Sequence, residues 1–311
     1  MKKNLITVTI LALLLVGCKS KDVVSQSSEG VESEVVDTVL PPIKDVESEA
    51  TDIGKDSAST MIQFANLADE ESRADLQNIL VSSEFSEETI NYYFELVDDF
   101  NSRVEDKGTL VTEYMPLENL DYSNVFLDPA NMYETNCRLA TFALTRDYIN
   151  APDAREYNDT YLMFDKEVLK TEPLYQTTEE NIQKFMNYFG TVDISGLTTM
   201  EEHIDKIRGH LENSGVTINL DENISIINIY LHSSYDNLRF VGHTGVLFKV
   251  ENGYVFVEKY GPYAPFQMTK FTNKFEVWDY IMTRKDLSSY DDELEPIIFE
   301  NLEVVEKQSE I

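Results

Sequence analysis

The sequence predicts an α+β protein in which helices come first and an antiparallel sheet follows. Up to Gly215 the apolar residues recur with the 3.6-residue period of helices, and from Ile224 onward they alternate with the period of two that is typical of strands. The dipeptide Asn252-Gly253 lies between two β-branched segments and is a strong hairpin signal. Helices segregated from an antiparallel sheet define the α+β class.

Two helices are predicted in the first half of the globular part. Ser86 can cap the first, because two glutamates follow it and an apolar stripe then runs from Ile90 to Val104. The second begins at Cys137 and continues to about Ile149, shortly before a proline. Aromatic residues on such stripes usually pack in the core, so we expect both helices to be amphipathic covers of a sheet.

Two further helices carry capping-box signals. Thr177 with Glu180 predicts the start of one helix, and Thr198 with Glu201 predicts the start of the next. Glycines are expected to end them, at Gly190 and Gly215.

Four strands and one helix are predicted after Gly215. The strands are expected at 224–231, 239–250, 254–260 and 266–271. A last helix is expected at 275–282, and an acidic tail follows it.

The N-terminus predicts export and attachment to a membrane. Residues 1–17 combine two lysines with an apolar run that is too short to span a bilayer and has the flanks of a secretory signal. The run ends in Leu15-Val16-Gly17-Cys18, which resembles the lipobox of bacterial lipoproteins. We therefore expect lipidated Cys18 to hold an extracytoplasmic protein on the bacterial cell membrane. Residues 18–57 are acidic and rich in serine, a composition that predicts a disordered tether.

Composition limits the partners of the remaining chain, which is predicted to form a single domain at 58–305 and a tail at 306–311. The sequence has 25 Lys+Arg against 57 Asp+Glu, for a formal net charge of -32. This charge argues against nucleic acid as a partner, since its binding needs a basic surface. We expect no cofactor and no metal, because the sequence has no phosphate loop and because His203 and His210, seven residues apart on one helix, are too distant to share an ion. Both histidines are interpreted as surface or packing residues.

Cys137 is the residue on which the functional prediction depends. With Cys18 assigned to lipid it has no disulfide partner, so it is either a small buried hydrophobe or a nucleophile. Asn136 is expected to cap the helix, which places Cys137 in the first turn, where unpaired N–H groups lower the pKa of a thiol. A nucleophilic cysteine also needs a nearby histidine and a third polar group that orients it. His243 is the candidate, because glycines on both sides of it would let another backbone or a substrate approach.

These residues resemble the NlpC-type branch of papain-like cysteine peptidases and amidases. The resemblance rests on Cys137 at a helix N-terminus and, later in the chain, on His243-Thr244-Gly245-Val246 in a strand. It implies a papain-like core at 130–285 with a helical insertion at 151–215 and a helical appendage at 58–107. The chain departs from the family where Asn136-Cys137-Arg138 replaces the usual Asp-Cys-Ser and where two extra helices precede the histidine. As a whole, the chain also resembles a bacterial lipoprotein family of unknown function.

The family resemblance implies a third residue on the strand after His243. Glu258 is favoured, because a carboxylate can orient and stabilise an imidazolium, and Gln267 and Tyr260 are the alternatives. A turn at Asn252-Gly253 would place Glu258 opposite Leu247, four residues from His243, and Tyr260 opposite Gly245. A bulge or a longer loop could bring Glu258 nearer to His243.

Two functions are open at this point. The first is a membrane-anchored cysteine hydrolase or acyl transferase, in which Cys137 attacks an amide carbonyl, His243 transfers the proton and Glu258 orients His243. The predicted location suggests cell-wall peptide or protein as its substrate. The second is a non-catalytic lipoprotein that binds a peptide, glycan or protein through its aromatic segment 260–267. Contact between Cys137 and His243 in an open groove would favour the first, and wide separation or burial without a groove would favour the second.

Overall fold

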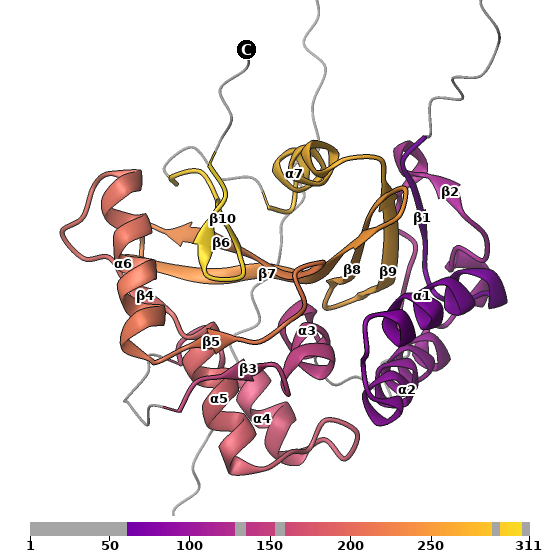
Figure 1. The fold of residues 1–311 in the computed structure, drawn as a ribbon, viewed down its shortest axis with the longest axis horizontal. Helices are drawn as coiled ribbons and strands as arrows, with labels where there is room; N and C mark the ends of the chain where they lie inside the picture. The colour runs from indigo at the N-terminus through magenta and orange to yellow at the C-terminus, as the bar shows by residue number, and fades with distance from the viewer. Residues whose placement is uncertain (1–60, 128–134, 153–158, 288–292, 307–311) are drawn as a thin grey trace, which may run out of the picture. The chain divides into compact units, whose positions relative to one another are not determined.

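A largely antiparallel sheet forms the centre of the computed structural model, which describes residues 61–127, 135–152, 159–287 and 293–306 (Figure 1). The strand order is β11-β10-β6-β7-β8-β9-β1-β2, and β4 pairs with β7 off this path. The four long strands are β6 (Ile224–Ser233), β7 (Leu238–Val250), β8 (Gly253–Gly261) and β9 (Ala264–Phe271). They contain the four strands predicted from the alternating pattern, so that part of the α+β prediction is confirmed.

Short strands extend this sheet, four of them from near the two ends of the described chain and one, β4, from its middle. They are β1 (Gln63–Ala65), β2 (Met115–Pro116), β4 (Val192–Asp193), β10 (Ile297–Glu300) and β11 (Glu303–Val304). The prediction that all strands follow the helices was therefore wrong, and β10 and β11 lie where an acidic tail was expected. Strands of two to four residues have no readable period, because pairing with a neighbouring strand determines them.

Seven helices are present among the described residues. They are α1 (Glu70–Ser82), α2 (Glu87–Arg103), α3 (Cys137–Thr145), α4 (Met163–Thr171), α5 (Glu179–Phe189), α6 (Met200–Asn213) and α7 (Lys274–Thr283). Helix α7 covers one face of the sheet and α3 lies against the other (Figure 1). Short pieces complete the fold: the 3-10 turns Lys107–Thr109 and Leu117–Asn119, and a small sheet of β3 (Ile149–Asn150) and β5 (Thr217–Ile218).

Two predicted helix caps are confirmed. The Ser86 hydroxyl accepts a hydrogen bond from the Thr89 amide at 3.1 Å. The Asn136 side chain accepts one from the Leu139 amide, also at 3.1 Å. Helix α3 nevertheless ends at Thr145, four residues earlier than predicted, because the chain then enters β3.

Both capping-box predictions were one residue early. The caps are Thr178 and Thr199, rather than Thr177 and Thr198. In both segments two adjacent threonines precede two glutamates. Either threonine could therefore act as the N-cap on sequence grounds. At α6 the complete box forms with Glu202, whose carboxylate accepts the Thr199 amide at 3.0 Å.

The β7–β8 hairpin has a different register from the predicted one. Val250 pairs with Gly253, so the turn consists of Glu251 and Asn252. Gly253 has a φ of +139° and lies so close to β9 that a Cβ would be 2.1 Å from the Phe271 carbonyl oxygen. Gly253 therefore allows β8 to pack closely against β9. The β7–β8 ladder is shifted by two residues from the predicted register.

The shift changes the neighbours of Glu258. It faces Gly245, rather than Leu247, and so lies two residues along the ladder from His243. The shifted register, and neither a bulge in this ladder nor a longer loop, brings Glu258 nearer to the histidine.

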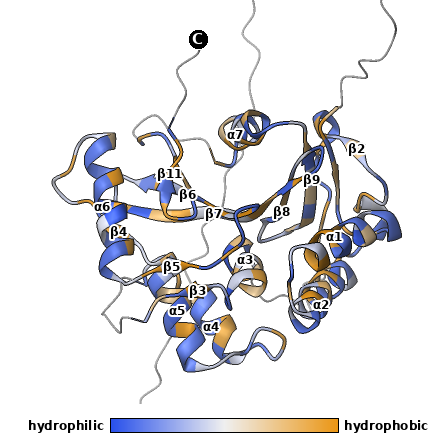
Figure 2. Ribbon diagram, viewed as in Figure 1, coloured by the Kyte–Doolittle hydropathy of each residue, from blue (hydrophilic) through white to orange (hydrophobic). Residues whose placement is uncertain are grey.

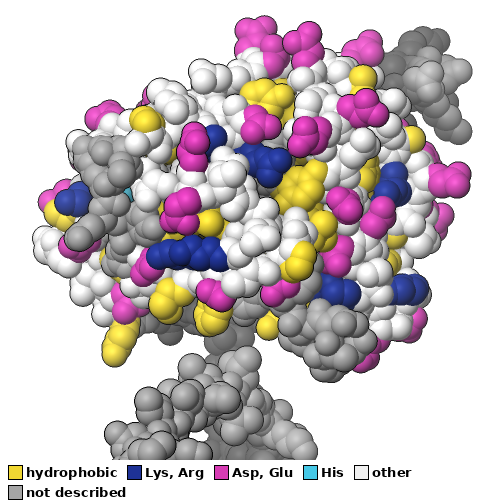
Figure 3. Space-filling view, turned by 90° about the horizontal axis from the view of Figure 1, so that it is seen from below, with side chains coloured by type: hydrophobic (Ala, Val, Ile, Leu, Met, Phe, Trp, Pro, Cys, Tyr) yellow, Lys and Arg dark blue, Asp and Glu magenta, His cyan; other side chains and the backbone are white. Residues whose placement is uncertain are grey.

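Two hydrophobic cores occupy the two faces of the sheet. Along β7, Val246 and Phe248 belong to the core on the α3 face, and Leu247 belongs to the core under α7. Figure 2 shows that hydrophilic and hydrophobic residues also recur along the helices that pack on the sheet. On the face of the molecule drawn in Figure 3, acidic side chains are spread among single lysines and arginines.

Residues Ser57–Ile311 cluster into one compact unit. The predicted signal peptide, Cys18, the tether and residues 307–311 lie outside the described part of the chain. Within the described part, every helix is too short or too polar to cross a bilayer.

Candidate active site

Cys137 is the first residue of α3, and its two sequence neighbours are held by one buried carboxylate. The Asn136 amide donates to Asp165 at 2.7 Å, and the Arg138 guanidinium pairs with Asp165 at 2.8 Å. Arg138 also donates to the Val241 carbonyl on β7 at 2.8 Å, which ties the start of α3 to the sheet. Asp165 belongs to α4, a helix that the sequence analysis did not predict. The departures from Asp-Cys-Ser thus have a shared partner.

His243 lies at a local irregularity of β7. On the β6 side, Ile229 pairs with His243 and Tyr230 pairs with Val241, so Gly242 is an extra, bulged residue. On the β8 side, the ladder ends at the pair Gly245–Glu258. His243 therefore projects its side chain next to the point where β7 and β8 stop pairing.

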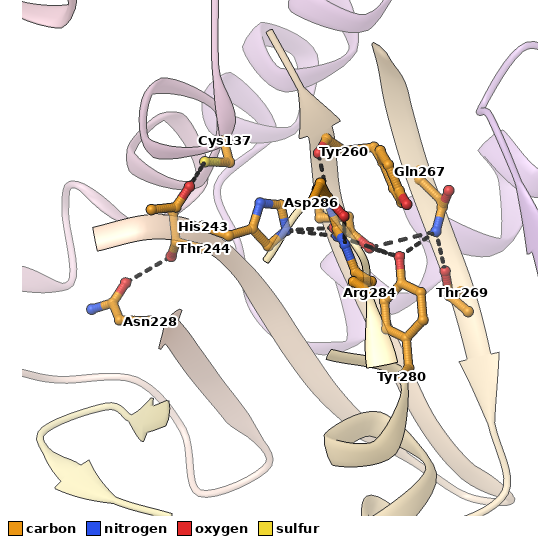
Figure 4. A network of polar contacts seen from close by, with 12 residues as sticks. Cys137, Asn228, His243, Thr244, Tyr260, Gln267, Thr269, Tyr280, Arg284 and Asp286 are labelled. Carbon is orange, nitrogen blue, oxygen red and sulfur yellow. Dashed lines mark hydrogen bonds and ion pairs between the residues drawn. The ribbon is translucent and has the colours of Figure 1, made fainter. Parts of the chain in front are cut away.

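The imidazole of His243 lies beside Cys137 and points toward Arg284 (Figure 4). Its Nε2 lies 2.5 Å from a Glu258 carboxylate oxygen, and its ring is close enough to the Cys137 thiol for each group to shift the pKa of the other. The thiol sulfur lies 3.9 Å from the Gly242 carbonyl oxygen. An ionised carboxylate only accepts hydrogen bonds, so we assign the Nε2 proton to the bond with Glu258, which leaves Nδ1 for the thiol. The structure thus brings together the three residues that the sequence analysis favoured.

Arg284, which the sequence analysis missed, is a fourth charged member of this group. Its Nη1 donates to the same Glu258 oxygen at 2.6 Å, and its Nη2 donates to Asp286 at 2.6 Å. The guanidinium also lies 3.8 Å over the ring of Tyr260. Nη1 is 3.1 Å from His243 Nε2, but both are donors, so the shared carboxylate holds them together.

A directed chain of hydrogen bonds supports the second oxygen of Glu258 (Figure 4). Tyr280 on α7 donates to it at 2.6 Å, and the Gln267 amide donates to the Tyr280 hydroxyl at 3.0 Å. The chain continues from Gln267 to Tyr122 at 2.5 Å and from Tyr122 to Asn66 at 2.6 Å. Each residue in the chain donates its hydrogen bond in the direction of Glu258. The second carboxylate oxygen therefore acts as a hydrogen-bond acceptor, as an ionised carboxylate does.

The two alternatives for the third residue occupy other positions. Gln267 pairs with Glu258 across β8 and β9, and its amide donates to the Glu258 carboxylate directly at 3.4 Å and to the Tyr280 hydroxyl at 3.0 Å. Tyr260 packs its ring on Arg284. Glu258 lies beside His243 Nε2. It was favoured for this position because a carboxylate can stabilise an imidazolium.

The charges of the group alternate in sign. Burial raises the pKa of the Cys137 thiol, but His243, Arg138 and the Thr244 amide together outweigh burial and lower it. Burial and Arg284 lower the pKa of His243, but Cys137 and Glu258 bring it above its usual value. Burial also raises the pKa of Glu258, and Arg284 and His243 overcome this and lower it to about 2. These directions favour a thiolate, an imidazolium, a carboxylate and a guanidinium in a row.

A family comparison covers this whole group of residues. The family described as Domain of unknown function (DUF4300) matches residues 63–305. The chain belongs to this family. No curated protein and no solved structure matches the chain. The matched region includes Asn66, where the hydrogen-bond chain starts, and Arg284, which contacts Glu258. All residues of the site described above therefore lie within the family domain.

The site is closed in this structure. Cys137 is 5% exposed and His243 is 2% exposed. The well-formed surface cavities among the described residues are lined by other side chains, at the start of α5 and between α6 and α7. The thiol and the imidazole lie close together, but the described residues form no groove that opens onto them. The criterion of contact in an open groove is therefore not met, and burial without a groove favours the binding protein.

The glycines beside His243 accommodate the protein itself, and not a substrate as expected. A Cβ at Gly242 would lie 2.3 Å from the Leu231 side chain, and one at Gly245 would lie 2.5 Å from the Phe256 ring and 2.8 Å from the Val257 carbonyl oxygen. Gly245 thus allows β8, and with it Glu258, to approach β7.

The Gly245→Ala variant is therefore expected to lower the free energy of unfolding by about 1–3 kcal/mol, because backbone must move to admit the methyl group. Urea unfolding measures this. Gly209→Ala is the matched control: its Cβ would meet nothing closer than 3.9 Å in the interior of α6, so it should stabilise the protein by up to about 1 kcal/mol. Equal effects of the two substitutions would contradict the packing role of Gly245.

The remaining histidines do not form a metal site with other described residues. His203 is buried and accepts a hydrogen bond from Arg239 at 3.2 Å. His232 pairs with Glu293 at 2.5 Å, and burial, followed by Arg239, lowers the pKa of both histidines. His203 therefore has a packing role, and His210 is half-buried on the same helix.

Proposed function

We propose that this protein is a papain-like cysteine hydrolase or acyl transferase that acts on an amide bond. One observation carries the proposal: a thiol at a helix N-terminus lies beside the bulge of β7, 3.9 Å from the Gly242 carbonyl oxygen, and the next residue, His243, lowers the pKa of this thiol while its Nε2 lies 2.5 Å from a buried carboxylate. The packing of α3 against β7 and β8, two antiparallel strands that supply His243 and Glu258, supports a papain-like arrangement. The link to papain-like proteins rests on the sequence resemblance around Cys137 and His243.

In the proposed reaction, the Cys137 thiolate attacks the amide carbonyl carbon, and the π electrons move to the oxygen. The oxyanion would be met by the Cys137 N–H, which has no intrahelical partner in the first turn of α3. His243 then gives its proton to the amine as the C–N bond breaks, which leaves a thioester on Cys137. Water or an acceptor amine attacks the thioester, His243 takes up the proton of this nucleophile, and the thiolate is regenerated.

Glu258 acts on His243 in this scheme. It accepts the Nε2 proton, keeps Nδ1 directed at the thiol and stabilises the imidazolium. A cell-wall peptide or protein substrate, membrane attachment through Cys18 and an extracytoplasmic location are part of the proposal and rest on the N-terminal sequence pattern.

A non-catalytic binding protein is the second candidate function, and the burial of Cys137 favours it. In the aromatic segment 260–267, Tyr263 is 52% exposed, whereas Phe266 and Gln267 are fully buried. Only part of that segment is therefore available as a recognition surface.

The test measures the rate at which iodoacetamide alkylates Cys137 between pH 5 and 9, with the labelled peptide identified by mass spectrometry. We expect the folded protein to be labelled at neutral pH, with a midpoint below the ordinary pKa of a thiol. His243→Ala should slow labelling at pH 7 on the order of tenfold, because less thiolate is present.

His210→Ala, on α6, is the matched control and should leave the rate unchanged. Equal labelling of wild type and His243→Ala would refute the proposed pair. Labelling of Cys137 only in urea would establish the buried, non-catalytic role.

A further inference from the structure

We infer that the groove between α6 and α7 is a docking site for a cationic amphipathic peptide segment of another protein. The groove has a volume of about 1260 Å³ and lies over β10 and β11 at the edge of the sheet. It shares no lining residue with the Cys137 group, so the inference is independent of the proposed function.

The floor of the groove is apolar. Trp278 and Met282 of α7 form one wall, and Ile204 of α6 forms the other. Between them lie Ile297 and Ile298, which belong to the cores on opposite faces of the sheet. Ile297 and Ile298 are themselves buried, so a partner's apolar side chains would cover the solvent-facing parts of the walls, including Phe275, which is 61% exposed.

The rim of the groove is acidic, and its two cations are already paired. Lys274 pairs with Glu300 at 2.6 Å, and Arg208 pairs with Asp205 at 3.4 Å. The other rim carboxylates, for which the described residues show no ion pair, are Glu201, Asp279, Glu303 and Glu306. A partner with basic residues beside its apolar ones would pack its apolar side chains on the floor and form ion pairs with the carboxylates of the rim.

Charge also selects among classes of occupant. The unpaired rim carboxylates repel phosphate-rich nucleic acid and anionic lipid head groups. An acidic protein surface would be repelled in the same way. A basic amphipathic helix instead places apolar residues at i, i+3, i+4 and i+7 in a groove and leaves its lysines for the rim.

The groove contains its own reporter, because Trp278 is the only tryptophan of the chain. The probe is a synthetic 18-residue peptide of leucine and lysine with helical amphipathic spacing, titrated into the full chain at physiological salt. We expect a saturable blue shift of the Trp278 emission. A peptide with the same composition in scrambled order has no apolar face and should bind at least tenfold more weakly.

The decisive comparison separates the groove from the general negative charge of the protein. The double variant Glu303→Lys, Glu306→Lys should weaken binding by tenfold or more. The double variant Glu167→Lys, Glu222→Lys changes the net charge equally at exposed positions outside the groove, and it should bind as wild type does.

Three results would overturn the inference: equal loss in the two double variants, equal binding of the scrambled peptide, or equal binding of an amphipathic peptide in which glutamate replaces lysine. Each of them would mean that the groove does not select a cationic amphipathic partner.

Discussion

Replacing Arg284 with methionine is expected to lower the free energy of unfolding by about 3–5 kcal/mol, because the variant leaves Glu258 as a buried charge without its guanidinium partner. Glu258 is 1% exposed, and Arg284 lies 2.6 Å from it. Urea unfolding at pH 7, with the midpoint and slope fitted separately, measures the loss.

Arg208→Met is the matched control for this prediction. Arg208 pairs with Asp205 at the surface, where its side chain is 39% exposed, so its removal should cost less than about 1 kcal/mol. A double-mutant cycle adds a second criterion: in a Glu258→Gln background the Arg284→Met substitution should cost much less, since no buried charge remains. A loss for Arg284→Met no larger than that for Arg208→Met would show that the pair contributes little.

Lowering the pH is expected to reduce the free energy of unfolding substantially, because Glu258 becomes protonated. Its pKa is about 2 in the folded protein, against the ordinary 4.5, because Arg284 and His243 outweigh the opposing effect of burial. A carboxyl with a depressed folded pKa stabilises the protein above its unfolded pKa, and this contribution is lost as the pH falls toward the folded pKa. Between pH 5.5 and pH 3 the loss should be about 2 kcal/mol.

The measurement is the difference in free energy of unfolding between wild type and Glu258→Gln over this pH range. The many surface carboxylates titrate in both proteins and cancel. His243, with a raised folded pKa, contributes stability that is lost only as the pH rises above its unfolded value, so it is protonated in both states here. A difference that stays constant from pH 5.5 to pH 3 would contradict the low pKa of Glu258.

The parts of the site that sequence reasoning recovered are locally encoded. The N-cap of α3 is determined by Asn136 and the residues that follow it, and His243 lies in a long strand with clear alternation. Both signals are read within a few residues, which is why the cysteine and the histidine could be placed on their elements before any geometry was known.

The errors lie where distant segments decide the outcome. The turn of the β7–β8 hairpin depends on how closely Gly253 approaches Phe271 of β9, so the dipeptide rule placed Glu258 two residues from its true partner. Arg284 follows α7 without any local pattern, and only the fold brings it to Glu258. The short strands β1 and β10 exist because neighbouring strands pair with them.

The placement of Arg284 near the end of the domain has a consequence for the order in which the polypeptide is made. Cys137 emerges from the ribosome long before His243, and Arg284 follows later still, so the thiol spends much of synthesis without the neighbours that lower its pKa. Strand β1, in contrast, must wait for β9 to close a loop of some two hundred residues, a slow step because long loops cost entropy. The pKa of Cys137 is therefore lowered only after the strand that carries His243 and Thr244 has been made and has packed against α3.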